Sequence, residues 1–395
     1  MAGLSEGCNS WDKFQFSEPG IVKTYGRSLW LHAGCGPGIR RVLLLKGPGG
    51  PISNHHRANQ TVPNLDDVAR AAGVSAMTVS RSFNRPQMVH PETRTRILGI
   101  AEEMGYIPNE AARSLVYGRT NTIALILPDI RNPFFTNVAR GVEDVAKRHG
   151  YILMLGNTDE HPAEERQYID ALSARRVDGV ILSTAGDGHV ELLQQRQIPV
   201  VLFDRSIPGV DADLVRADVY DAGWKLVTHL AEQGYREIAF VGGPGGISTL
   251  ETRLAGCREA AEAAGVHLAV HLGRFDQASG EEIVGGLCAE GAVPEAIVGA
   301  NNLVAVGALV ALRRCGLRVP EDVGLACFGA LELASLIDPF LTVVRDPEYE
   351  TGRVAMELLH RRISGYDGPP ITRILPVELI ARRSTWRNGE PPGQN

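Results

Sequence analysis

The apolar positions follow two different patterns along the chain, and the change falls near residue 120. From Leu65 to about Tyr117, apolar residues recur three and four positions apart, which is typical of helices with one buried face. After Thr120, short continuous apolar runs alternate with amphipathic stretches. The runs are Ile123–Leu127, Tyr151–Leu155, Gly179–Leu182, Pro199–Phe203, Glu237–Val241, Ala296–Val298 and Val323–Ala326. Continuously apolar strands need helices on both faces of the sheet, so the pattern predicts parallel α/β sheets. The runs are too many for one typical sheet, so we expect two lobes with a cleft at the carboxyl ends of their strands.

Start and stop signals divide the first region into three helices. Asn64 can cap a first helix that Gly73 ends, and Ser75 can cap a second helix from Ala76 to about Phe83. A third helix opens at Pro91, and its expected inward side chains are Ile97, Leu98, Ala101 and Met104. Two helices joined by a glycine-containing turn and supported by a third form the helix-turn-helix arrangement.

The side chains of the second helix suit a DNA groove. Short polar residues that can contact phosphate oxygens are Ser75, Thr78, Ser80 and Asn84. Residues that can contact base edges are Ala76, Met77 and Arg81. An arginine can donate two hydrogen bonds to guanine, and apolar side chains can contact a thymine methyl group. Each of these residues alone is more simply a cap or a solvated charge, but their combination favours DNA binding.

The distribution of charge agrees with a DNA-binding head on an acidic body. The whole chain carries a net charge of −6. Residues 1–60 hold seven basic and three acidic residues, and residues 61–119 hold seven basic and six acidic. The acidic excess therefore lies in the remaining residues, and the attraction to phosphate is local to the head.

Composition excludes several other classes of protein. The chain has 44% hydrophobic and 22% charged residues, which is typical of globular proteins, and it has no apolar run long enough for a membrane helix. Six cysteines show no zinc-ligand spacing, so we expect buried free thiols and neither metal nor cofactor. The N-terminus has no signal-peptide pattern, so we expect a cytoplasmic protein without membrane contact.

The head motif resembles that of the lac repressor family of bacterial transcription regulators, also called the lac/galactose repressor family. Thr78–Arg81, Gly105–Asn109 and Ala111–Leu115 carry this resemblance, which continues to about residue 385. The resemblance implies a hinge helix that forms when two subunits meet on operator DNA and places a leucine in the minor groove. The hinge residues it implies are Asn109, Ala112 and Leu115. A segment this short does not form a stable helix alone, so it could serve as a switch.

The body resembles the ribose-binding type of periplasmic binding protein, which this family uses to bind its effector. The segments that carry the likeness are Asp129–Phe135, Asn157–Asp159, Val177–Leu182, Phe203–Arg205, Arg253–Gly256 and Asn301–Asn302. The effector-binding residues implied by the resemblance are Asn132, Phe134, Phe135, Arg205, Thr249, Arg253, Phe275 and Asn301. Aromatic faces can stack on a sugar ring, while Arg and Asn supply directed donors.

Two departures from the family pattern bear on the effector. Asn302 and Gly329 stand where many relatives have aspartate. Loss of an acid at Gly329 removes an acceptor for hydroxyl groups and a repulsion for anions, and gluconate-type members show a similar sequence there. We therefore expect a sugar acid or a similar anion, with a neutral sugar as the alternative.

These expectations define a fold class, a domain order and a function. The fold class is α/β, with a three-helix head and a hinge helix before a two-lobed body of two parallel sheets flanked by helices. The predicted segments are a disordered extension (1–61), the helix-turn-helix domain (62–108), hinge and linker (109–120), the effector-binding and dimerisation domain (121–386) and a flexible tail (387–395). The predicted function is a homodimeric repressor that binds a pseudo-palindromic operator and that its effector releases from DNA. The chain ends without a leucine-heptad tail, so a tetramer is not expected.

Two other classes of protein fit less well. A periplasmic binding protein would share the lobes but would need a signal peptide and would have no head. A dinucleotide-dependent enzyme would need a G-x-G-x-x-G loop, and the loop Gly242–Gly246 lacks that spacing. Neither Gly-x-Ser-x-Gly nor His-Glu-x-x-His occurs, so we expect no enzymatic activity.

Overall fold

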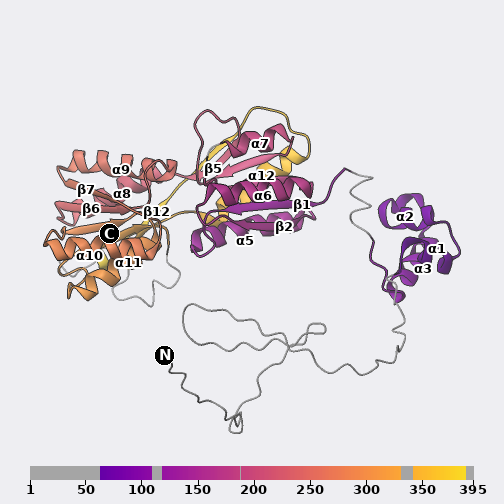
Figure 1. Cartoon of the computed structure of the whole chain (residues 1–395), viewed down its shortest axis with the longest axis horizontal. Helices are drawn as coiled ribbons and strands as arrows, with labels where there is room; N and C mark the ends of the chain where they lie inside the picture. Colours follow the sequence, from indigo (N-terminus) through magenta and orange to yellow (C-terminus); the bar gives the residue numbers. More distant parts are fainter. Residues whose placement is uncertain (1–62, 109–117, 187, 331–340, 388–395) are drawn as a thin grey trace, which may run out of the picture. The chain divides into compact units, whose positions relative to one another are not determined.

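The computed structural model describes residues 63–108, 118–186, 188–330 and 341–387. The chain divides into two compact units, Met1–Ile107 and Pro108–Asn395. In the first unit the described residues form the head, and in the second they form the two-lobed body (Figure 1). The extension 1–61 therefore lies outside the described residues, as do most of the predicted hinge and tail.

The head consists of three α-helices around a small apolar core. They are α1 (Leu65–Ala72), α2 (Ala76–Asn84) and α3 (Pro91–Glu103), with a 3₁₀ turn, η1, at Pro86–Met88. Asn64 and Asp67 form a capping box at the start of α1, and Gly73 ends it with a φ of 63°. The buried core residues are Val68, Ala69, Ala72, Val79, Ile97 and Ala101.

One inward position of α3 was predicted wrongly. Ile100, rather than Leu98, packs against the head core, beside Ile97, Ala101 and Met104. These four residues are spaced i, i+3, i+4 and i+7, which keeps them on one helical face, whereas Leu98 is turned about 100° away from Ile97.

The body contains two six-stranded sheets. The sheet of the N-terminal lobe has the order β11-β5-β4-β3-β1-β2, and its strands are β1 (Thr122–Leu127), β2 (Ile152–Asn157), β3 (Gly179–Leu182), β4 (Val200–Phe203), β5 (Asp213–Ala217) and β11 (Thr372–Leu375). The sheet of the C-terminal lobe has the order β12-β10-β9-β8-β6-β7, and its strands are β6 (Glu237–Gly242), β7 (His267–Leu272), β8 (Ala296–Gly299), β9 (Gly324–Phe328), β10 (Thr342–Arg345) and β12 (Glu378–Ile380). All neighbours pair in parallel except β10 and β12.

Helices cover both faces of each sheet. The N-terminal lobe has α5 (Pro133–Arg148), α6 (Pro162–Ala174), α7 (His189–Gln195) and α12 (Glu348–Ile363). The C-terminal lobe has α8 (Val219–Glu232), α9 (Ser248–Ala264), α10 (Gln277–Glu290), α11 (Asn302–Arg314) and the 3₁₀ turn η3 (Arg383–Thr385). This arrangement confirms the predicted α/β fold, and each of the seven predicted apolar runs contributes a strand.

The chain crosses between the lobes three times. It passes from β5 to α8, returns from β10 to α12, and passes again from β11 to β12. As a result, α12 supplies Ala355, Met356 and Leu359 to the core of the N-terminal lobe, far in sequence from the strands it covers. Neither lobe is a continuous piece of sequence.

Two observations differ from the predicted tail and thiols. Arg387, assigned to the tail, donates to the Gly234 carbonyl at 2.7 Å and pairs with Glu295 at 2.9 Å. Of the four cysteines among the described residues, Cys257 and Cys327 are buried, but Cys315 is exposed at the end of α11.

Three helix pairs pack through glycines contributed by both partners. They are Gly141 with Gly352 (α5 and α12), Gly223 with Gly256 (α8 and α9) and Gly280 with Gly307 (α10 and α11). A methyl group added to Gly280 would overlap the Val304 carbonyl oxygen, and one added to Gly307 would overlap that of Gln277. These glycines therefore allow backbone to approach backbone.

We expect Gly280→Ala to destabilise the protein and Gly286→Ala to stabilise it. The first forces α10 and α11 apart, and such overpacking costs about 1–3 kcal/mol. The second lies on the same helix with nothing within 4 Å of an added methyl group, so it gains only the helix propensity of alanine, up to about 1 kcal/mol. Urea denaturation of the two variants measures both effects, and shifts of the same sign would contradict the close approach of these helices.

Candidate functional site

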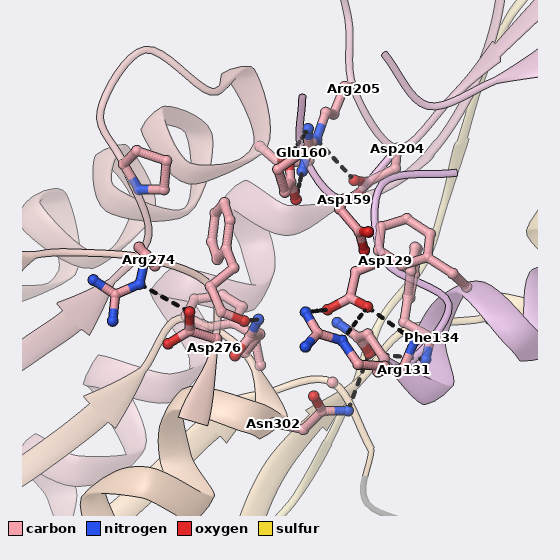
Figure 2. Close-up of a pocket in the computed structure, with 18 of the residues that line it drawn as sticks. Asp129, Arg131, Phe134, Asp159, Glu160, Asp204, Arg205, Arg274, Asp276 and Asn302 are labelled. Carbon is pink, nitrogen blue, oxygen red and sulfur yellow. Dashed lines mark hydrogen bonds and ion pairs between the residues drawn. The ribbon is translucent and has the colours of Figure 1, made fainter. Parts of the chain in front are cut away.

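A cavity of about 370 Å³ lies between the lobes, at the carboxyl ends of the strands. It is lined by all eight predicted effector-binding residues: Asn132, Phe134, Phe135, Arg205, Thr249, Arg253, Phe275 and Asn301. Its volume is in the range that small-molecule ligands occupy. Figure 2 shows the polar side chains that converge on it from both lobes.

The start of α5 forms one wall of the cavity. Asn132 caps this helix, because its Oδ1 accepts the Phe134 backbone N–H at 3.0 Å. Phe134 and Phe135 pack edge to face with ring centroids 5.0 Å apart. Phe135 is 5% exposed and also belongs to the lobe core, so Phe134 offers the more accessible ring.

Arg205 follows β4 and is held by several acceptors. It donates two hydrogen bonds of 2.7 Å to the carboxylate of Glu160 (Figure 2). It also donates one of 3.0 Å to the Thr184 carbonyl. Its Nε lies 3.8 Å from the Asp204 carboxylate. These contacts fix the plane of a buried guanidinium group in the cavity wall.

Arg253 projects from α9 in the opposite lobe. It donates to the Ala300 carbonyl at 3.0 Å, lies 3.8 Å from the Asp346 carboxylate, and stands over the Phe328 ring at 5.0 Å from its centroid. Arg253 is only 8% exposed. Arg253 is therefore the cation that faces the buried carboxylate of this lobe.

Phe275 and Asn301 complete the C-terminal wall. Asn301 caps α11 by accepting from the Val304 N–H at 2.8 Å, and its amide donates to the Phe275 carbonyl at 3.0 Å. The Phe275 ring lies against Gly243, where any side chain would overlap it. Asn301 thus positions the aromatic residue.

The cavity also contains six carboxylates that the sequence analysis did not assign to it. They are Asp129, Asp159, Glu160, Asp204, Asp276 and Asp346. Most of them follow a strand directly or closely, and the carboxyl ends of parallel strands meet at the cleft. An acid just after a buried apolar run was the signal available in the sequence. The cleft is therefore rich in carboxylates even though Gly329 has no acid.

Each of the four cavity arginines already has a carboxylate partner. Arg205 pairs with Glu160 and Arg253 with Asp346, as described above, while Arg131 pairs with Asp129 at 2.9 Å and Arg274 with Asp276 at 2.9 Å. The guanidinium-bearing side chains of the last two pairs are exposed, 71% for Arg131 and 60% for Arg274, and they come from opposite lobes. With four arginines and six acids, the cavity has no surplus of positive charge for an anion.

Burial changes the protonation of the deepest acids. It raises the pKa of Asp346 to about 6, although Arg253 acts in the opposite direction. Burial likewise raises the pKa of Asp204, against the effects of Arg253 and Arg205. Four buried atoms of the wall have no hydrogen-bond partner among the described residues: Arg205 Nε, Arg253 Nε, Asn302 Oδ1 and Asp346 Oδ1. Two donors and two acceptors are thus left for a ligand or for water.

We expect Asp346→Asn to change how stability depends on pH. A carboxyl with a raised pKa binds its proton in the folded state but not in the unfolded state between about pH 4 and 6. This group therefore lowers stability as pH rises through that window, by about 1.4 kcal/mol per pH unit at most. Thermal unfolding from pH 4 to 8 should show wild type losing stability relative to Asp346→Asn across the window and a constant difference above it. Parallel curves would contradict the raised pKa.

The predicted DNA-binding residues lie along α2 of the head. Ser75 caps α2 by accepting the Thr78 N–H at 3.2 Å, and the two hydroxyls lie 2.9 Å apart. Asn84 donates to the Ser80 hydroxyl at 3.3 Å. These polar residues thus form hydrogen bonds with one another along the helix, and their hydroxyl groups keep further hydrogen-bonding capacity for DNA.

The three predicted base-contacting residues differ in exposure. Met77 is 62% exposed and Arg81 is exposed, which suits a groove-facing role. Ala76, in contrast, is half-buried and packs against the head core, which leaves less of it for a base. The hinge residues Asn109, Ala112 and Leu115 lie outside the described residues.

Neither a metal centre nor a membrane span is found among the described residues. No group of three or more His, Cys, Asp or Glu side chains there is arranged to hold a metal ion. No helix in the same residues is long and apolar enough to cross a membrane.

Two family models match the chain and together cover head and body. The model for bacterial regulatory proteins of the lacI family matches residues 64–109. The model for periplasmic binding proteins and the sugar-binding domain of the LacI family matches residues 120–382. These matches fall on the two units of the structure.

Similar proteins include repressors and sugar-bound regulators. The ribose operon repressor of Halalkalibacterium halodurans is 36% identical over 82% of this chain and 98% of its own length. The transcriptional repressor CytR of Escherichia coli is 32% identical over 83% and 98%. Among solved structures, the regulator CelR in complex with cellobiose is 31% identical (TM-score 0.63), and the lac repressor dimer bound to operator and an anti-inducer is 26% identical (TM-score 0.73). Both comparisons cover 82% of this chain and 99% of the other.

Proposed function

Because the chain belongs to the LacI family of bacterial regulatory proteins, we propose that it represses transcription and that a neutral sugar in the cleft releases it from its operator. The protein is a DNA-binding regulator with a sugar-type effector domain. The cavity between the lobes carries the finer proposal, because its polar groups select the ligand class.

The polar groups of the cavity favour hydroxyl groups over a carboxylate. Every cavity arginine is paired with an acid, so an anionic ligand would have to displace a carboxylate and would meet a cavity with two more acids than arginines. A hydroxyl group donates and accepts at once. The two unpaired donors and two unpaired acceptors of the wall match this property. The rings of Phe134 and Phe275 supply apolar faces for a sugar ring.

The sequence-based preference for a sugar acid is therefore replaced by its alternative. That preference rested on the acid missing at Gly329 and on a likeness to gluconate-type members there. Asp346 and Asp204 supply acceptors at the same cavity. The sugar-bound structure and the ribose repressor among the similar proteins support the same class of ligand.

Calorimetric titration tests the ligand class. We expect an uncharged pentose, hexose or disaccharide to bind, and the corresponding aldonates to bind at least tenfold more weakly. A gel-shift assay with the promoter of its own or the adjacent operon should show binding without the sugar and release with it. Tight binding of an aldonate without binding of any neutral sugar would reject the neutral-sugar proposal.

A homodimer that reads a palindromic operator is part of the proposal. The lac repressor structure similar to this chain is a dimer on its operator. In this chain, β2 is an edge strand that exposes Ile152 (68%) and Leu155 (42%), and a second copy would cover these apolar side chains. Sedimentation should find a dimer, and Ile152→Asp should weaken it.

We further propose that the protein acts in the cytoplasm and has no enzymatic activity. The similar proteins are transcriptional regulators, and their DNA is in the cytoplasm. The acids and arginines of the cavity are paired with one another, an arrangement suited to binding a ligand. Sugar recovered unchanged after incubation with the protein is the expected result.

A further inference from the structure

The N-terminal lobe ends in a basic surface where the linker enters it. Since all strands of this sheet are parallel, their amino ends share one edge, and the helices between them end at that edge. Eight basic residues at this edge form what we call the basic end: Arg119, Lys147, Arg148, Arg175, Arg176, Arg196, Arg361 and Arg362. All of them except the half-buried Arg362 are exposed.

Several contacts join these residues into one surface. Arg119, Arg176, Arg196 and Arg362 line a single hollow of about 450 Å³. Arg119 donates to the Ile363 carbonyl at 3.1 Å, and Thr120 donates to the Arg176 carbonyl at 2.9 Å. The ends of α5 and α12 meet through the stacked rings of His149 and His360, 3.7 Å apart. The linker therefore joins the lobe within the basic end.

The basic end keeps a net positive charge after its acids are counted. Six acids lie at the same edge or pair with its basic residues: Glu143, Asp170, Asp178, Asp211, Asp213 and Asp367. Lys147 pairs with Glu143 at 2.7 Å, and Arg196 pairs with Asp170 at 2.6 Å. Asp213 is occupied by Arg362 and Asp178 by Thr120. The local balance is thus two positive charges, in a chain whose net charge is −6.

Helix stability accounts for only part of this charge. Basic residues at helix C-termini interact favourably with the helix dipole, which suffices for Arg148. Arg119 precedes the first strand, outside any helix, and Arg176 lies beyond the end of α6 with a φ of 55°. These two arginines flank the entry of the linker and gain nothing from a dipole.

We propose that the basic end is a second DNA-facing surface, which attracts backbone phosphates of the duplex held by the heads. This inference rests on the proposed operator binding. The ten residues 108–117 between head and body can span at most about 36 Å, which limits how far the body can lie from a duplex that the head holds. Exposed arginines attract phosphates over a Debye length of about 8–10 Å. The contribution is independent of base sequence, because it acts on phosphates alone.

The test compares two double variants of the full-length protein. Arg148→Gln/Arg176→Gln removes charge from the basic end, while Arg258→Gln/Arg314→Gln removes the same charge from exposed positions on α9 and α11 of the other lobe. Operator affinity is measured from 50 to 300 mM salt by fluorescence anisotropy. Removing one arginine–phosphate interaction makes the slope of log K against log salt shallower by about 0.9.

We expect the slope of the first variant to be shallower by about 1 to 4 in the dimer, and we expect it to bind operator and random duplex more weakly by the same factor. The second variant should match wild type. Extending the operator duplex from 20 to 40 base pairs should strengthen wild type more than the first variant. If wild type binds its operator but both variants have the wild-type slope, the basic end does not face DNA. If wild type binds no operator at all, the proposed function fails first.

Discussion

Replacing Arg253 with methionine is expected to lower the affinity for the sugar effector at least 100-fold and to leave operator binding insensitive to it. Methionine keeps much of the apolar stem but removes the cation that faces Asp346 at 3.8 Å. Arg253 also lowers the pKa of Asp204, more than Arg205 does, against the effect of burial. Two buried carboxylates, Asp346 and Asp204, would then remain without this partner. Breaking a buried ion pair in this way lowers the free energy of unfolding by about 3–5 kcal/mol.

The control for this prediction lies on the same helix. Arg258→Met removes an exposed arginine of α9 and should leave sugar binding within a factor of two of wild type. Calorimetric titration gives the affinity, and a gel shift with and without sugar gives the response. Sugar binding by Arg253→Met within threefold of wild type would show that Arg253 is structural only.

A second variant separates loss of folding from loss of binding. Arg253→Met/Asp346→Asn also removes the charge that Arg253 faces, so it should recover much of the thermal stability. It should not recover sugar affinity, because both the guanidinium donor and the carboxylate acceptor are gone. Recovery of both quantities would mean that Arg253 acts only by neutralising Asp346.

Replacing Arg81 with alanine is expected to weaken operator binding by about 2–6 kcal/mol in a dimer. One arginine that pairs with guanine contributes about 1–3 kcal/mol, and each head of the dimer would lose one. Arg81 is exposed on α2, whose core side is Val79, so the head should keep its fold. Random duplex should be bound nearly as before, because base contacts and not phosphate contacts are removed.

The informative quantity is the ratio of operator to random-duplex affinity. Arg96→Ala, at an exposed position on α3, should change both affinities equally or not at all. For Arg81→Ala the ratio should fall at least 30-fold, and a library of operator variants should lose preference at one position of each half-site. An unchanged ratio would place Arg81 on the phosphate backbone.

The sequence predicted the fully buried strands and the edge strand β2, and it missed five others: β5, β7, β10, β11 and β12. β3, β4 and β8 are four-residue strands with every residue buried, and their continuous apolar runs are unmistakable. In contrast, β11 is mostly exposed and β5 alternates between buried and half-buried positions. One-sided burial leaves no continuous run, so these strands are decided by tertiary pairing.

The candidate site divides in the same way. The aromatic and basic residues were found because the family resemblance implies them. The acids were missed, since an aspartate after a strand is also a common loop residue, and only the fold shows that Asp129, Asp204 and Asp346 face one cavity. Ala76 also packs against the head core, which helical spacing alone did not predict, and its contact with a base stays a prediction.

The three crossings between the lobes also dictate the order of events during synthesis. The core of the N-terminal lobe needs α12, and its sheet needs β11, which is complete only at Leu375. The C-terminal sheet in turn waits for β12, Glu378–Ile380. A ribosome must therefore release nearly the whole polypeptide before either half can finish folding, and the apolar strands made early stay open to aggregation in the meantime.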